Sequence, residues 1–134
     1  MVVFTFPGDP PREPIAWYRR GGTWRSAPID PGRLPDAGVV PAGQRLVNAV
    51  RNWGTGFIAI GDTSGDDGME PVGMVWYSAD GSSWTRMPVH DNGFDTSFHL
   101  LDIAISRKKA VLVGNPSNGS KNLLIWQADA PPNY

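Results

Sequence analysis

Two histidines and several nearby carboxylates are the residues whose types suit acid–base or metal chemistry. His90 and His99 are the only histidines of the chain, and Asp91, Asp95 and Asp102 lie near them in the sequence. Imidazole nitrogens and carboxylate oxygens are common metal ligands, and a histidine can exchange protons near neutral pH. We expect both histidines in a connection between strands, where such residues are usually solvated or cap a turn. The sequence therefore predicts no catalytic residue and no metal ligand among them.

A second acidic group lies in one short stretch of the chain. It consists of Asp62, Asp66, Asp67 and Glu70, with Gly68 among them. Oxygen ligands around a glycine can bind calcium, but the spacing does not match an EF-hand loop. We interpret the stretch as a polar connecting loop and keep a calcium site as the alternative. No resident cofactor is predicted.

Charge, cysteine content and hydropathy bound the classes of partner. The net charge is −1, and the basic run Arg107-Lys108-Lys109 is short, so nucleic-acid binding is not predicted. No stretch approaches the ~18–20 apolar residues of a membrane helix, so no membrane span is expected. The apolar start, residues 1–6, is too short for a signal peptide. The chain has no cysteine, which removes disulfides and thiolate zinc sites but leaves the compartment unknown.

The composition points to short strands joined by turns. The chain has 134 residues, with 16 glycines, 13 prolines and six tryptophans. Few windows lack Gly or Pro for the ~10 residues that a helix needs. The predicted fold class is therefore all-β, in a single domain over residues 1–134.

An internal repeat of about fifty residues organises the chain. Its clearest marks are Trp17, Trp76 and Trp126, which follow apolar runs and stand 59 and 50 positions apart. A second pattern matches residues 57–61 with 110–114, and a third matches 46–50 with 101–105. The repeated unit predicts four antiparallel strands, A to D, over 46–50, 57–61, 73–78 and 83–87. The predicted units are 1–28 (strands B to D), 45–88 (complete) and 100–128 (strands A to C).

The strands at the centre of the repeat are apolar on both faces. Residues 57–60 and 74–77 show this, and a strand apolar on both faces must be covered on both faces. A β-propeller blade is such a sheet, because a neighbouring blade packs on each side. The sequence thus predicts a partial β-propeller, with an open antiparallel β-sandwich-like stack as the alternative. The repeat positions of the three tryptophans favour a core between sheets over a carbohydrate-stacking surface.

The most specific motif is Ser78-Ala79-Asp80-Gly81-Ser82-Ser83-Trp84. Asp80 can accept hydrogen bonds from backbone N–H groups that a tight turn leaves unpaired, and Gly81 can take a positive φ. Ser78 can bond to the turn, and Trp84 can return its ring to the sheet. The motif resembles the Asp-box of the bacterial neuraminidase repeat, found in sialidase-like and sortilin-like β-propellers. The resemblance implies that these four residues form a structural turn between strands C and D, away from any ligand site.

The same resemblance raises the possibility of an enzyme. It implies that sialidase catalysis would need three arginines, a Tyr–Glu pair and an acidic Asp, and the Arg-Ile-Pro segment of that family is absent. Tyr18 and Tyr77 occupy equivalent repeat positions, as do Glu13 and Glu70, while Tyr134 is outside the repeat; this favours packing and loop roles. The predicted function is a non-catalytic propeller segment acting as scaffold or binding module. The alternatives are a fragment of a sialidase-like glycoside hydrolase with catalytic residues outside this chain, and a carbohydrate- or peptide-binding module.

The number of blades that the chain can supply bears on the partners that we expect for it. Ten expected strands make about two and a half blades, whereas propellers have at least about four. A terminal blade without a neighbour would expose an apolar face larger than soluble monomers usually show. We therefore expect either further blades beyond this chain or self-association, and a glycan or peptide as ligand.

Overall fold

The computed structural model describes residues 2–5, 15–29, 44–64, 73–87, 98–106, 109–117 and 121–129. In these ranges the chain forms ten strands and no helix, so the all-β prediction is confirmed. Within the same ranges, no helix has the length and apolar character that crossing a membrane requires.

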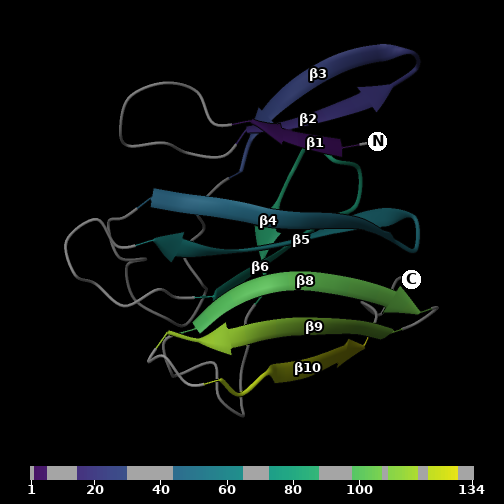
Figure 1. Cartoon of the computed structure of the whole chain (residues 1–134). Coiled ribbons are helices and arrows are strands. Elements are labelled where there is room, and N and C mark those ends of the chain that lie inside the picture. The colour runs from purple at the N-terminus through teal and green to yellow at the C-terminus, as the bar shows by residue number, and fades with distance from the viewer. Residues whose placement is uncertain are drawn as a thin grey trace.

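The strands form three antiparallel sheets that follow one another along the chain (Figure 1). The first sheet contains β1 (Val2–Thr5), β2 (Ile15–Arg20) and β3 (Thr23–Pro28). The second contains β4 (Gln44–Trp53), β5 (Gly56–Ser64), β6 (Gly73–Ser78) and β7 (Thr85–Arg86). The third contains β8 (Phe98–Ser106), β9 (Lys109–Pro116) and β10 (Leu124–Asp129), in the order β10-β9-β8.

The second sheet has the four strands expected between 46 and 87, with different lengths. The predicted antiparallel pairing of 73–78 with 83–87 is confirmed, since Trp76 lies opposite Arg86. Strands β4 and β5 are longer than expected and leave only Gly54 and Thr55 between them, rather than a connection over 51–56. Strand β4 continues up to Trp53 because the side chain of Trp53 is fully buried, and the turn begins at Gly54, which has a φ of 63°.

The connection between β2 and β3 is also a two-residue hairpin. Arg20 pairs with Thr23, and Gly21 and Gly22 between them have φ of 59° and 85°. Positive φ at both central residues is the type I′ geometry, which matches the twist of paired strands. The corresponding connection of the second sheet is the longer loop from β6 to β7, so the two repeats turn this corner by different means.

The second sheet is buried on both faces. On one face, Ile58, Ile60 and Val75 pack against residues of β8 and β9, in a core cluster that also contains Trp53. Alternate residues of β5 and β6 point to the opposite face, towards the first sheet. That second cluster comprises Ala16, Ile29, Ala59, Met74, Trp76 and Trp84. The two clusters account for the apolar character of both faces of 57–60 and 74–77.

The sheets approach one another mainly along β1, β4, β5 and β8. Strand β8 packs against β4 and β5, and β1 lies beside β4 (Figure 1). The outer strands β3 and β10 lie on opposite sides of the second sheet. The result is a stack of three antiparallel sheets, which is compatible with the open sandwich-like alternative.

Matching β-bulges show which positions of the second and third sheets are equivalent. Asn48 is the extra residue of β4, after Val47 pairs with Gly61. Leu101 is the extra residue of β8, after Leu100 pairs with Gly114. Both the bulges and the glycines are thus 53 positions apart. The sequence match of 46–50 with 101–105 was two residues out of register, because a shift of two preserves the alternation of faces.

Candidate functional site

The loop from β6 to β7 is organised by the carboxylate of Asp80. Its Oδ1 accepts hydrogen bonds from the backbone N of Ser82 (2.8 Å) and of Ser83 (3.2 Å). Its Oδ2 accepts one from Ser82 Oγ (2.5 Å), and Ser78 Oγ lies 3.5 Å from Oδ1. One side chain thereby satisfies two backbone donors that the loop would otherwise leave unpaired.

The other motif residues complete the loop from inside. The backbone N of Gly81 donates to the buried Ser78 Oγ (2.8 Å), and Gly81 has a φ of 83°. Trp84 is buried in the cluster between the first and second sheets, and its Nε1 donates to the Gly81 carbonyl (3.0 Å). The loop therefore fixes the direction in which the tryptophan ring enters the core.

These contacts also set the charge of the loop. The hydroxyl of Ser82 is the largest cause that lowers the pKa of Asp80 below its ordinary value of 3.8, with the backbone N–H groups of Ser82 and Ser83 acting in the same direction. Slight burial opposes them. The carboxylate stays ionised to lower pH than a free aspartate, which suits a hydrogen-bond acceptor rather than a proton donor near neutral pH.

A partly buried polar cluster joins the second and third sheets. Asn48 Nδ2 donates to Asp62 Oδ2 (3.0 Å) and to the Leu100 carbonyl (2.5 Å). Asp62 Oδ2 also lies 3.4 Å from His99 Nδ1, an ion pair when the imidazole is protonated. Asp62 is only 3% exposed, so the amide donor stabilises a carboxylate that is shielded from water.

This cluster changes the interpretation of two acidic or basic residues. Asp62 belongs to β5 and not to a loop, because β5 continues past Gly61. His99 lies in β8, not in a connection. The other members of the two sets, Asp66, Asp67, Glu70, His90, Asp91 and Asp95, lie outside the described residues. Among the residues that the structure does describe, no three His, Asp or Glu side chains are grouped closely enough to hold a metal ion. The calcium alternative for the full set stays a prediction.

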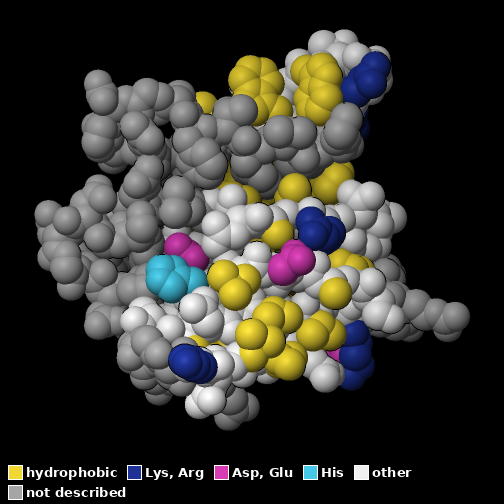
Figure 2. All heavy atoms as spheres, viewed as in Figure 1, with side chains coloured by type: hydrophobic (Ala, Val, Ile, Leu, Met, Phe, Trp, Pro, Cys, Tyr) yellow, Lys and Arg dark blue, Asp and Glu magenta, His cyan; other side chains and the backbone are white. Residues whose placement is uncertain are grey.

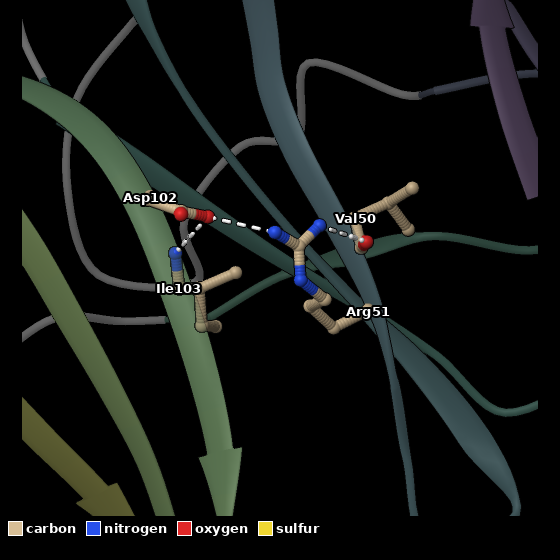
Figure 3. Close-up of polar contacts among 4 residues, drawn as sticks. All are labelled: Val50, Arg51, Asp102 and Ile103. Carbon is tan, nitrogen blue, oxygen red and sulfur yellow. Dashed lines mark hydrogen bonds and ion pairs between the residues drawn. The ribbon is translucent and has the colours of Figure 1, made fainter.

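Asp102, the remaining carboxylate near the histidines, takes part in a second contact between the sheets (Figure 3). Arg51 on β4 donates to Asp102 Oδ1 on β8 (2.9 Å), and its other terminal nitrogen donates to the Val50 carbonyl (2.9 Å). Asp102 Oδ1 also accepts from the backbone N of Ile103 (2.7 Å). The side chains of Arg51 and Asp102 are 47% and 64% exposed, so this ion pair contributes at most about 1 kcal/mol to the free energy of unfolding.

The repeat tryptophans divide between core and surface. Trp76 is fully buried, as predicted, and Trp126 is partly buried, with its ring 4.8 Å from that of Phe98. The core prediction is wrong for Trp17, which is 38% exposed on the face of the first sheet that points away from the second. Trp24 on the neighbouring strand is 41% exposed. Their exposure follows from the position of the first sheet at one end of the stack.

The tyrosines and the basic run have structural surroundings where they are described. Tyr77 meets Trp53 edge to face, with ring centroids 6.5 Å apart, and Tyr18 packs on the cluster between the first two sheets. The packing role predicted for both is confirmed. Lys109 begins β9 and lies 3.8 Å from Asp129. Glu13, Tyr134, Arg107 and Lys108 lie outside the described residues.

Sequence reasoning missed the cluster of Asn48, Asp62 and His99. The available signal was an asparagine inside the apolar run 46–50 and an aspartate directly after Gly61. Polar residues in strands that are otherwise apolar usually have a buried partner. The pairing itself depends on the bulge at Asn48, which alternation alone does not reveal.

Comparison with known proteins gave no relative. No family model, no curated protein and no solved structure matches this chain. Membership of the Asp-box family therefore stays a prediction carried by the residues from Ser78 to Trp84.

Proposed function

We propose that this chain is a non-catalytic segment of β-propeller type whose role is that of a scaffold. The observation that carries the proposal is the second sheet, which is buried on both faces by the first and third sheets. A sheet in the middle of a series is what a propeller blade requires. Strand β8 packs across β4 and β5, and β1 lies beside β4, so the three sheets meet as consecutive blades do.

The loop between β6 and β7 supports the same proposal. The bonds of Asp80 satisfy backbone donors within the loop, and Trp84 anchors the loop in the core. This is the structural role expected of an Asp-box at the corner between strands C and D. The described polar contacts between the second and third sheets, at Asn48 and at Arg51, likewise hold sheets together.

A substrate panel tests the non-catalytic part of the proposal. The purified chain is assayed against aryl glycosides, including sialosides, with Tyr77→Phe and Asp62→Asn as matched variants. We expect no turnover above buffer. Turnover that either variant removes would contradict the proposal and favour glycoside hydrolysis.

A crystal structure tests the propeller part. In a propeller, the inner strands β4 and β8 lie closer together than β6 and β10. Equal separations along the whole width of the sheets would instead assign the chain to a parallel-faced sandwich-like stack.

Ligand binding is a second candidate, favoured by the exposed rings of Trp17 and Trp24. Adjacent aromatic rings on a sheet can stack on sugar rings or on peptide side chains. A glycan array followed by tryptophan-fluorescence titration tests this candidate. Binding that is lost in Trp24→Ala and retained in Thr55→Ala would support it, and an array without binders would not.

A further inference from the structure

The outer face of the third sheet is equivalent, by repeat position, to the face of the second sheet that packs on the third sheet. In the second sheet, Ile60 and Val75 pair across β5 and β6 and pack on the third sheet. The positions 53 residues on from Ile60 and Gly61 are Val113 and Gly114, and Val113 pairs with Ile125 across β9 and β10. The pair Val113–Ile125 thus stands where Ile60–Val75 stands, but it points away from the second sheet.

This outer face is apolar and open. Ile125 is 63% exposed, and Leu101, which occupies the bulge position of Asn48, is 49% exposed. Val111 and Val113 are half-buried between them. Figure 2 shows hydrophobic side chains gathered over β8, β9 and β10. We call these four residues the aliphatic face.

The outer face of the first sheet is equivalent, by repeat position, to the other face of the second sheet, which packs on the first sheet. Trp76 pairs with Arg86, and Trp84, two residues before that arginine, packs beside it on the first sheet. Trp17 pairs with Ser26, and Trp24 stands two residues before that serine. Trp17 and Trp24 therefore occupy the places of the buried pair Trp76 and Trp84.

The surface formed by Trp17 and Trp24 is called the tryptophan face. Arg19 pairs with Trp24 and shares this face. Figure 2 shows hydrophobic side chains on the first sheet with a basic side chain beside them. Within the described part of the first sheet, residues 15–29, there are arginines and no acidic residue.

We propose that the tryptophan face of one copy of this chain docks on the aliphatic face of a second copy. The contact continues the series of sheets: the first sheet of one copy covers the third sheet of the next, as the first and second sheets cover each other within one chain. It extends the scaffold role proposed above.

The packing inside the molecule favours a second copy as the partner. Between the first and second sheets, the rings of Trp76 and Trp84 share a core cluster with Ala16 of β2 and with Ile29, which follows β3. The aliphatic face offers Val111 and Val113 to the rings of the neighbouring copy, so aromatic rings again meet aliphatic side chains. The exposed carboxylates of the third sheet, Asp102 and Asp129, already have Arg51 and Lys109 as partners, so the match of apolar surfaces and not charge argues for this contact.

The geometry of the contact is head to tail. The two faces lie at opposite ends of the stack and differ in composition, so the interface is heterologous, and copies form a ring or an open chain. A heterologous contact makes a distinctive prediction, since a variant that lacks one face retains the other.

The experiment measures the mass of the full chain by light scattering and sedimentation over a range of concentrations. Trp24→Lys disrupts the tryptophan face, Ile125→Lys disrupts the aliphatic face, and Thr55→Lys adds the same charge in the exposed turn after β4. Far-UV circular dichroism checks that each variant is folded. If a lysine variant unfolds, Trp24→Ser or Ile125→Gln replaces it.

We expect the unmodified chain and Thr55→Lys to associate, with dissociation constants at least tenfold lower than those of either face variant. Mixing Trp24→Lys with Ile125→Lys should restore a dimer, because one intact face of each kind remains. A monomeric unmodified chain at every concentration would overturn the proposal. So would an oligomer that neither variant weakens, or a mixture that forms no dimer. The proposed scaffold role is tested separately, by turnover and by the separation of the inner strands.

Discussion

The indole nitrogens of two tryptophans in one core cluster have opposite environments, and this contrast gives a quantitative prediction. Trp76 and Trp84 both lie between the first and second sheets. Trp84 Nε1 donates to the Gly81 carbonyl at 3.0 Å, whereas Trp76 Nε1 is buried and has no hydrogen-bond acceptor among the residues that the structure describes. Replacing each by phenylalanine removes the same ring atoms but has opposite effects on hydrogen bonding.

The free energies follow from these environments. Phenylalanine has two fewer side-chain carbons than tryptophan, a loss of about 1.6 kcal/mol at ~0.8 kcal/mol per buried carbon. In Trp76→Phe the loss of an unpaired N–H returns about 1–3 kcal/mol, so the free energy of unfolding should change by less than about 1.5 kcal/mol. In Trp84→Phe the lost hydrogen bond adds about 0.5–1.5 kcal/mol, so the variant should be destabilised by about 2–3 kcal/mol.

Urea denaturation followed by far-UV circular dichroism measures both values, because this signal does not depend on the removed fluorophore. Low and equal protein concentrations keep the degree of self-association the same in both variants. Equal destabilisation of the two variants would refute the reasoning and would mean that Trp76 Nε1 has an acceptor in solution.

Three further predictions concern the loop and the contacts between sheets. The pKa of Asp80 is lowered in the folded chain, so its carboxylate contributes to the free energy of unfolding above the ordinary value of 3.8, and this contribution is lost as the pH falls through the folded pKa. Urea denaturation from pH 7 to 2 should therefore show that the stability difference between the unmodified chain and Asp80→Asn shrinks only below about pH 4. Gly73→Ala places a methyl group against the Phe98 ring and should cost about 1–3 kcal/mol in thermal unfolding, and Phe98→Leu in the same chain should recover part of it. Asn48→Ala leaves the buried carboxylate of Asp62 without its amide donor and should lower the free energy of unfolding by about 1–3 kcal/mol. Arg51→Ala should lower it by less than about 1 kcal/mol in the same urea assay, and the reverse order would contradict the assignment of Asn48 to the buried contact.

The strands were predictable where both faces are apolar. Residues 57–61 and 73–78 are such segments, and both lie in the strands expected. The turn at Asp80 was predictable because its chemistry is local, as all its partners lie within three residues of it. Local hydrogen bonds and period-two apolar patterns can be read from a single sequence because neither depends on distant contacts.

The contacts between sheets were not predictable in the same way. The register of β4 against β8 depends on the bulges at Asn48 and Leu101, and a two-residue shift leaves the apolar pattern unchanged. The exposure of Trp17 depends on the end position of its sheet, not on its own repeat position, which is that of Trp76. These features are set by the tertiary arrangement, so equivalent residues acquire different surroundings.

The hydrogen bonds of the loop after β6 have a consequence for chemical ageing. An aspartate followed by glycine can cyclise to a succinimide when the glycine nitrogen attacks the side-chain carboxyl carbon and water leaves, and hydrolysis of the ring then yields aspartate and isoaspartate. In this loop the nitrogen of Gly81 donates to Ser78 Oγ, and the carboxylate of Asp80 accepts hydrogen bonds from the backbone nitrogen and hydroxyl of Ser82. Because both reacting groups are engaged in hydrogen bonds in the native loop, isomerisation at this bond should proceed mainly in molecules in which the loop has transiently opened.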